Sequence, residues 1–126
     1  MSASFFLNRP GDHPDETFSW DATSGAASWV IYFIADRVRD QEVAAFLRET
    51  PTLIFALAKF DDEQAADIVR IIREDMLPAA EAVSAAHPDN YLALFVRDLV
   101  EGTIRWSDGK DFWVRRAARQ DGDAGE

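Results

Sequence analysis

Three carboxylates near the middle of the chain are the first candidates for chemistry. Asp61, Asp62 and Asp67 follow the spacing Asp-Asp-x4-Asp. Carboxylate oxygens are hard ligands of the kind that Mg²⁺ prefers in proteins. The cluster therefore raises one hypothesis: a small Mg²⁺-dependent helical enzyme, such as a phosphohydrolase, or a ligand-binding protein that uses these carboxylates.

The cluster is similar to the acidic motif with which prenyl-transferring enzymes hold Mg²⁺ and a diphosphate substrate. The similarity is confined to this short stretch. Such enzymes need a large helical barrel and a second acidic cluster, which a chain of 126 residues is too short to provide. Carboxylates also gather in the first turn of a helix because the positive end of the helix dipole stabilises them. We therefore expect this structural role at Asp61, Asp62 and Asp67, and no bound metal.

Other residue types that carry catalysis are scarce. The chain has no cysteine, which excludes disulfides, thiolate metal sites and cysteine nucleophiles. His13 and His87 each stand beside a proline, and no His-Glu-x-x-His pattern occurs. The serines and glycines form no nucleophile elbow, P-loop or dinucleotide fingerprint. The sequence therefore favours a protein that is not an enzyme, and no cofactor is expected.

Negative charge dominates the composition and is concentrated in the middle of the sequence. The net charge is −10, from 23 acidic and 13 basic residues. Residues 61–101 hold 10 acidic and 3 basic residues and so account for −7 of it. Direct binding of nucleic acid is disfavoured, because counterion release at phosphates needs a basic surface. A basic protein partner is the better expectation.

Four carboxylates share the side of a predicted helix that lies opposite its apolar stripe. We call Glu63, Asp67, Glu74 and Glu81 the acidic face. Arg70 can pair with Glu74 at i, i+4, whereas Glu63 and Asp67 repel at the same spacing. Two interpretations stay open. The acidic face is an ordinary solvated surface, or it binds a basic partner whose positive charge relieves the repulsion among its carboxylates.

A second candidate surface lies in residues 105–119, where five basic and two acidic residues stand beside three aromatic ones. Its candidate contact residues are Trp106, Trp113, Arg115 and Arg116. Basic residues interleaved with aromatic ones can bind single-stranded nucleic acid. Given the overall charge, we expect instead that the aromatic residues are core. The arginines would then bridge to acidic segments of the same chain or of a neighbouring copy, which leaves a homo-oligomer open.

Apolar residues at helical spacing predict the elements that position these surfaces. One stripe covers residues 27–38, and the clearest covers residues 65–83. Pro78 lies inside the second stripe and should kink or interrupt that helix near Asp75.

Shorter helices are predicted between and after these stripes. The pattern indicates a second helix around residues 43–47 after a bend, a short central helix over 53–58, and another helix from residue 92. Asp61 and Gln64 have the spacing of a capping box, which places a helix start there.

Both ends of the chain are predicted to differ from this helical middle. Residues 1–21 contain a run of turn formers and several aromatic residues, so we expect an extended aromatic arm packed along the domain. Near the other end, Asp108-Gly109 is a hairpin signal, and a helix that ends near Ser107 is the alternative we favour. Residues 120–126 should form a disordered tail.

Together these features predict an all-α domain over residues 1–119, an irregular bundle of five or six helices with the arm across it. No apolar run approaches the ~20 residues of a membrane span, so a cytoplasmic protein without membrane contact is expected. The leading function is a small acidic protein–protein interaction module, such as an immunity-type protein or inhibitor that binds a basic partner. The alternatives are the Mg²⁺-dependent protein above and a DNA mimic that presents carboxylates in place of phosphates.

Overall fold

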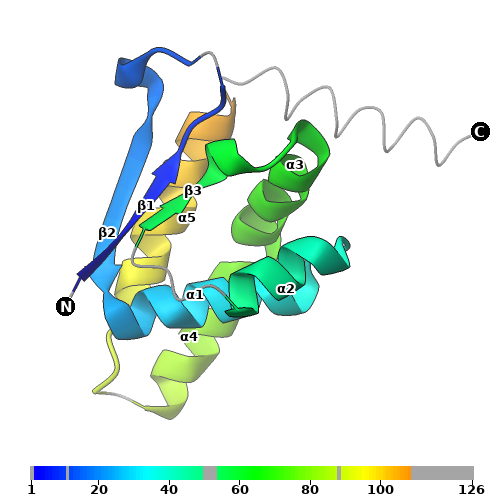
Figure 1. The fold of residues 1–126 in the computed structure, drawn as a ribbon. Helices are drawn as coiled ribbons and strands as arrows, with labels where there is room; N and C mark the ends of the chain where they lie inside the picture. Colours follow the sequence, from blue (N-terminus) through cyan, green and yellow to red (C-terminus); the bar gives the residue numbers. More distant parts are fainter. Residues whose placement is uncertain (1, 11, 50–53, 88, 109–126) are drawn as a thin grey trace, which may run out of the picture.

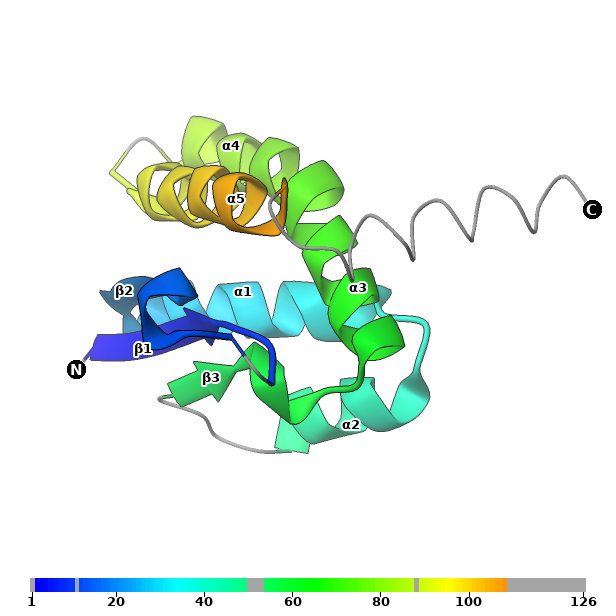
Figure 2. The same cartoon turned by 90° about the horizontal axis from the view of Figure 1, so that it is seen from above.

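Helices pack against one face of a small mixed sheet (Figures 1 and 2). The computed structural model describes residues 2–10, 12–49, 54–87 and 89–108. The strands are β1 (Ser2–Leu7), β2 (Phe18–Thr23) and β3 (Ile54–Ala56). The helices are α1 (Ser24–Arg37), α2 (Gln41–Glu49), α3 (Asp62–Ile71), α4 (Leu77–Ala86) and α5 (Leu92–Asp108). In Figure 2, α4 and α5 form one layer, α1 and the sheet form another, and α3 connects them.

The prediction of an all-α bundle of five or six helices is wrong. The fold is mostly helical, but its three strands form a sheet in the order β2-β1-β3. β1 pairs antiparallel with β2, which places Phe5 opposite Trp20. β1 also pairs parallel with β3, which places Phe5 beside Phe55. Among the described residues, α3 and α4 join into one continuous helical segment, so the helical segments number four.

The predicted aromatic arm is the β1–β2 pair of this sheet. Along β1, Ala3, Phe5 and Leu7 are buried, while Ser4 and Phe6 between them are partly exposed. This alternation is typical of a strand with one face on the core. The turn formers that follow lie in the connection from β1 to β2, and this connection contains a 3-10 turn at Pro14–Glu16.

The short helix predicted over residues 53–58 is also wrong. Ile54–Ala56 is strand β3, and Leu57–Lys59 forms a 3-10 turn. A short apolar run fits a buried strand as well as a helix, and periodicity cannot separate the two. The free backbone edge of β1 decides the outcome, because pairing with it satisfies the backbone hydrogen-bonding groups of Ile54–Ala56 that face β1.

The longer helices are confirmed together with their caps. Thr23 caps α1 by accepting a hydrogen bond from the Ala26 N–H at 3.3 Å. The segment Asp62–Ala86 runs through α3, a π-helical turn at Ile72–Met76, and α4. This turn lies just before Pro78, which lacks an N–H and clashes with the carbonyl four residues earlier. The interruption expected near Asp75 is therefore present.

Helix α5 continues to Asp108, so residues 103–107 are helical. A hairpin whose first strand begins at Thr103 is thereby excluded, and the favoured helical alternative is confirmed up to that point. Trp113, Arg115, Arg116 and the predicted tail at 120–126 lie outside the described residues.

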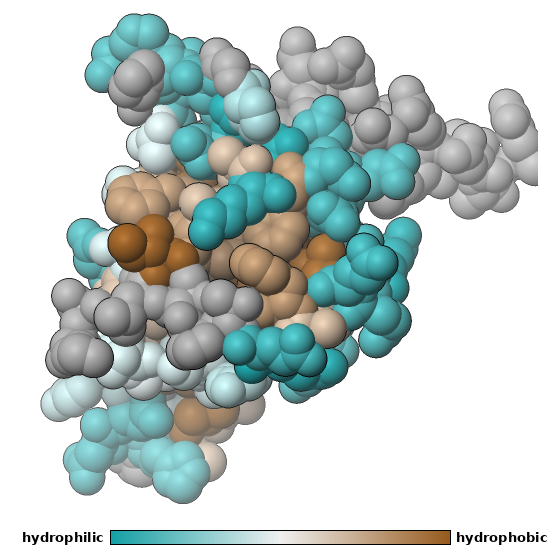
Figure 3. All heavy atoms as spheres, viewed as in Figure 1, coloured by the Kyte–Doolittle hydropathy of each residue, from teal (hydrophilic) through white to brown (hydrophobic). Residues whose placement is uncertain are grey.

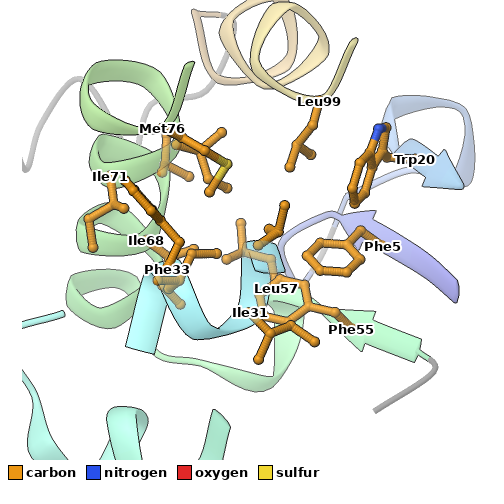
Figure 4. Packing of buried hydrophobic residues seen from close by; sticks show 14 of the residues in the cluster. Phe5, Trp20, Ile31, Phe33, Phe55, Leu57, Ile68, Ile71, Met76 and Leu99 are labelled. Atoms are coloured by element: carbon orange, nitrogen blue, oxygen red, sulfur yellow. The ribbon is translucent and has the colours of Figure 1, made fainter. Parts of the chain in front are cut away.

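An aromatic cluster joins the sheet to the helices (Figure 4). Phe5 stacks on Phe55 with ring centroids 4.8 Å apart and meets Trp20 edge-on at 5.0 Å. Trp20 Nε1 donates to the Phe95 carbonyl oxygen at 2.9 Å, which ties β2 to α5. Leu99 of α5 points toward the same cluster. The core is thus built between the sheet and helices that come from both halves of the chain.

Gly102 lets β2 approach α5 closely. A Cβ atom at this helical position would overlap the ring of Phe18. Glycine inside a helix is less stable than alanine by about 1 kcal/mol, so its presence here is explained by packing.

We predict that Gly102→Ala lowers the free energy of unfolding, although alanine is the better helix former. Overpacking of this kind costs ~1–3 kcal/mol, which exceeds the gain in helix propensity. Urea denaturation measures the change. Phe18→Leu should recover part of the loss in the Gly102→Ala background. An increase in stability on Gly102→Ala alone would show that the two elements are not in contact there.

A second prediction concerns the buried side of Asp62–Ala86. Ile68 and Ile72 are both 0% exposed, so truncation of either to alanine should cost the ~2–5 kcal/mol typical of aliphatic core residues. Ile54, which is 58% exposed, is the matched control and should change stability by about 0.5 kcal/mol or less. Equal effects at all three positions would contradict this packing.

Candidate functional site

The carboxylates of the Asp-Asp-x4-Asp cluster each have a separate structural partner. Asp61 is the N-cap of α3: its side chain accepts from the Gln64 N–H at 2.8 Å, and Gln64 Oε1 accepts from the Asp61 N–H at 3.0 Å. The capping box expected from their spacing is thus confirmed. Asp62 accepts from the Arg9 guanidinium at 2.8 Å.

Arg9 links three parts of the fold. Its side chain is 8% exposed, and one nitrogen donates to the Leu57 carbonyl oxygen at 2.9 Å while another pairs with Asp62. A guanidinium at this depth needs a counter-ion and hydrogen bonds to offset lost hydration. Asp62 therefore neutralises Arg9 and fixes the start of α3 beside the turn that follows β3.

Asp67 is held by the fold rather than presented to solvent. Its side chain is 12% exposed, and it pairs with Arg70 at 2.9 Å. Its second oxygen accepts from the Arg39 N–H at 2.8 Å, in the bend between α1 and α2. Among the described residues, no group of three possible ligands is placed to hold a metal ion. The geometry therefore does not bring Asp61, Asp62 and Asp67 together.

Arg70 lies at the centre of the acidic face and is shared by three carboxylates. It contacts Asp67 at 2.9 Å, Asp75 at 3.7 Å and Glu74 at 3.8 Å, and we call these four residues the Arg70 cluster. One guanidinium neutralises one carboxylate, so the cluster keeps a net negative charge. The nearby Arg73 is engaged elsewhere, because it pairs with Asp108 of α5 at 2.6 Å.

Asp75 is a member of this surface that the sequence pattern missed. Residues five apart on an α-helix point in different directions, so Arg70 and Asp75 would not be expected to pair. The π-helical turn Ile72–Met76 is wider, and it brings position i+5 back toward position i. The sequence signal for this contact is Pro78, which predicts an interruption but not its consequence for charge.

The remaining acidic-face residues are open to solvent. Glu63, Glu74 and Glu81 are exposed on the continuous segment Asp62–Ala86. In Figure 3, hydrophilic residues cover the region of α2 and α3, whereas apolar residues occupy the middle of the same view, over the sheet. The structure thus presents three of the four predicted acidic-face side chains and keeps Asp67 in a structural role.

The second candidate surface is described only at its beginning. Trp106 is 7% exposed and belongs to the apolar core. Its ring therefore does not offer a contact surface, in agreement with the expectation that aromatic residues here are core. The other candidate contacts, Trp113, Arg115 and Arg116, lie outside the described residues.

Comparisons with protein-family models, with curated proteins and with solved structures find no match to this chain. In the described part of the chain, no helix combines the length and the apolar character needed to cross a membrane.

Hydrogen bonds lower the pKa of Asp40 from its ordinary value of 3.8. The largest cause is the Gln64 side-chain amide, which donates to the carboxylate at 2.9 Å, and the backbone N–H groups of Glu42 and Val43 add to it. Gln64 thus connects the start of α2 to the cap of α3, which holds the acidic face in position.

This lowered pKa predicts an acid-dependent loss of stability. A carboxyl group whose pKa is lower in the folded state stabilises the fold above its unfolded pKa, and the contribution is lost as pH falls through the folded value. The loss should therefore begin near pH 3.8 and continue below it. In Asp40→Asn and in Gln64→Ala, the fall in unfolding free energy over this range should be smaller than in the wild type. Chemical denaturation at a series of pH values measures it, and identical profiles would contradict the assignment.

Proposed function

We propose that the protein is a small protein–protein interaction module that binds a basic partner through the acidic face, in the manner of an immunity-type protein or inhibitor. A cytoplasmic location belongs to this proposal. The observation that supports it is the Arg70 cluster, in which three carboxylates share one guanidinium. Like charges held together in this way destabilise the free protein, and cationic groups from a partner would relieve the repulsion.

The accessible carboxylates suit a partner's lysine or arginine side chains. Glu63, Glu74 and Glu81 are exposed on one continuous helical segment, where the cationic groups of a partner can reach them. Asp67 and Asp62 contribute indirectly, because they fix this segment to the rest of the fold through the Arg39 N–H and the Arg9 guanidinium. Charge complementarity of this kind mainly raises the association rate and selects among partners.

The test compares two variants with the same change in net charge. Glu63→Gln, Glu74→Gln and Glu81→Gln together remove the exposed charge of the acidic face but keep Asp67 and Asp75 on Arg70. The matched control replaces three exposed carboxylates elsewhere: Asp15→Asn, Asp21→Asn and Glu49→Gln. Partners captured from the host by the wild type are identified and purified, and association rates are measured for all three proteins across a salt series.

We expect the acidic-face variant to associate more slowly than the wild type and to lose most of its salt dependence. The control should keep both properties of the wild type. Screening by salt limits the interaction between exposed charges to ~8 Å at physiological ionic strength, so charges remote from the acidic face contribute little to binding there. If the two variants associate at equal rates at every salt concentration, the acidic face is only a solvated surface.

A further inference from the structure

An apolar pocket lies apart from the acidic face, between the first turns of α1, the end of α4 and the start of α5. Its volume is about 430 Å³, within the range of small-molecule sites. Its walls include the rings of Trp29, Tyr91 and Phe95 together with Val83 and Leu92. Trp29 and Phe95 are only partly buried, and Tyr91 is 66% exposed, so aromatic surface is left open in this pocket.

The lining is uncharged, although charged residues make up 29% of the chain. Its polar side chains are Thr23 and Asn90 and the hydroxyl group of Tyr91. A charged ligand would lose hydration here without meeting a counter-ion, which disfavours it strongly. A neutral ligand escapes this penalty and can still form a hydrogen bond with the amide or a hydroxyl group.

Hydrogen bonds fix the walls of the pocket before any ligand arrives. Asn90 Oδ1 accepts from the Leu92 N–H at 2.7 Å, which holds the start of α5. The Ala93 N–H donates to Ser84 Oγ at 3.1 Å, which ties α5 to α4. Trp29 stacks on Phe33 with ring centroids 5.0 Å apart. A preformed pocket binds with less loss of conformational entropy than one that must be ordered.

We propose that this pocket binds a small neutral molecule that carries an aromatic ring and a single hydrogen-bonding group. The ring would lie among Trp29, Tyr91 and Phe95, where offset or edge-on aromatic contacts are favourable. The polar group would meet Asn90 or Thr23 at the wall. This activity does not depend on the acidic face or on a basic partner.

Gly25 provides a way to fill the pocket without disturbing the fold. It lines the pocket, and a Cβ atom built on it meets no atom within 4 Å. Gly25→Phe should therefore occupy space that the ligand needs. Gly25→Ala adds a methyl group only and is the matched control. Leu94→Ala is a second control, because Leu94 is an exposed apolar residue (57%) that does not line the pocket.

The probe is indole, compared with its charged analogues indole-3-acetate and tryptamine. Titrations followed by ¹⁵N–¹H NMR should show saturable shifts for pocket residues with indole, and both analogues should bind at least about tenfold more weakly. Gly25→Phe should weaken indole binding by a similar factor, whereas Gly25→Ala and Leu94→Ala should bind it as the wild type does. If Gly25→Phe does not give a folded spectrum, Tyr91→Ala replaces it, because truncation of this exposed side chain removes one wall.

Three results would overturn the proposal. The first is indole binding that Gly25→Phe or Tyr91→Ala leaves unchanged, which would place the ligand elsewhere. The second is binding of either charged analogue as tightly as indole, which would remove the argument for a neutral ligand. The third is concentration-dependent self-association of the wild type that Gly25→Phe abolishes, which would show that a second copy of the chain covers the pocket.

Discussion

The pairing of β1 with two strands is the constraint on which the rest of the structure depends. β1 lies in the middle of the sheet, so its backbone pairs with that of β2 on one side and with that of β3 on the other. Its central residue, Phe5, is 1% exposed and contacts an aromatic ring from each neighbour. Because β3 begins about 50 residues after β1 in the sequence, this pairing brings the chain back to its own start. It thereby sets where Asp62–Ala86 can begin.

The ion pairs follow from that placement and divide the carboxylates into two groups. Asp62 pairs with Arg9, which anchors the helix to the segment that follows β1. The largely buried Asp67 accepts from the Arg39 N–H, which anchors the helix to the bend between α1 and α2. Glu74 and Asp75 lie farther along, where Arg70 is already paired with Asp67 at the shortest distance in its cluster. Glu74 and Asp75 therefore keep negative charge that Arg70 alone does not neutralise.

The sequence alone was sufficient for the elements whose signals are local. The caps at Thr23 and Asp61, the long apolar stripes and the interruption before Pro78 depend on neighbouring residues, and the structure confirms them. The sheet was missed because β3 is only three residues long and becomes a strand only when β1 is beside it. The same limit applies to the site: helical spacing identified Glu74 and Glu81, but the burial of Asp67 depends on Arg39, 28 residues away. The proximity of Asp75 to Arg70 depends on the widened turn.

The central claim is that the three carboxylates of the Arg70 cluster carry negative charge that their one shared guanidinium does not neutralise. It is tested most directly by the unfolding free energy of Glu74→Gln, which removes one carboxylate from the Arg70 cluster, measured against the wild type at low and at high ionic strength. Relief of like-charge repulsion should make the variant more stable at low salt by roughly 0.2–0.5 kcal/mol for each repulsive pair removed, and the difference should vanish at high salt because of screening. A variant that is less stable than the wild type at low salt would show that these carboxylates are already compensated, and the account of the acidic face would fail.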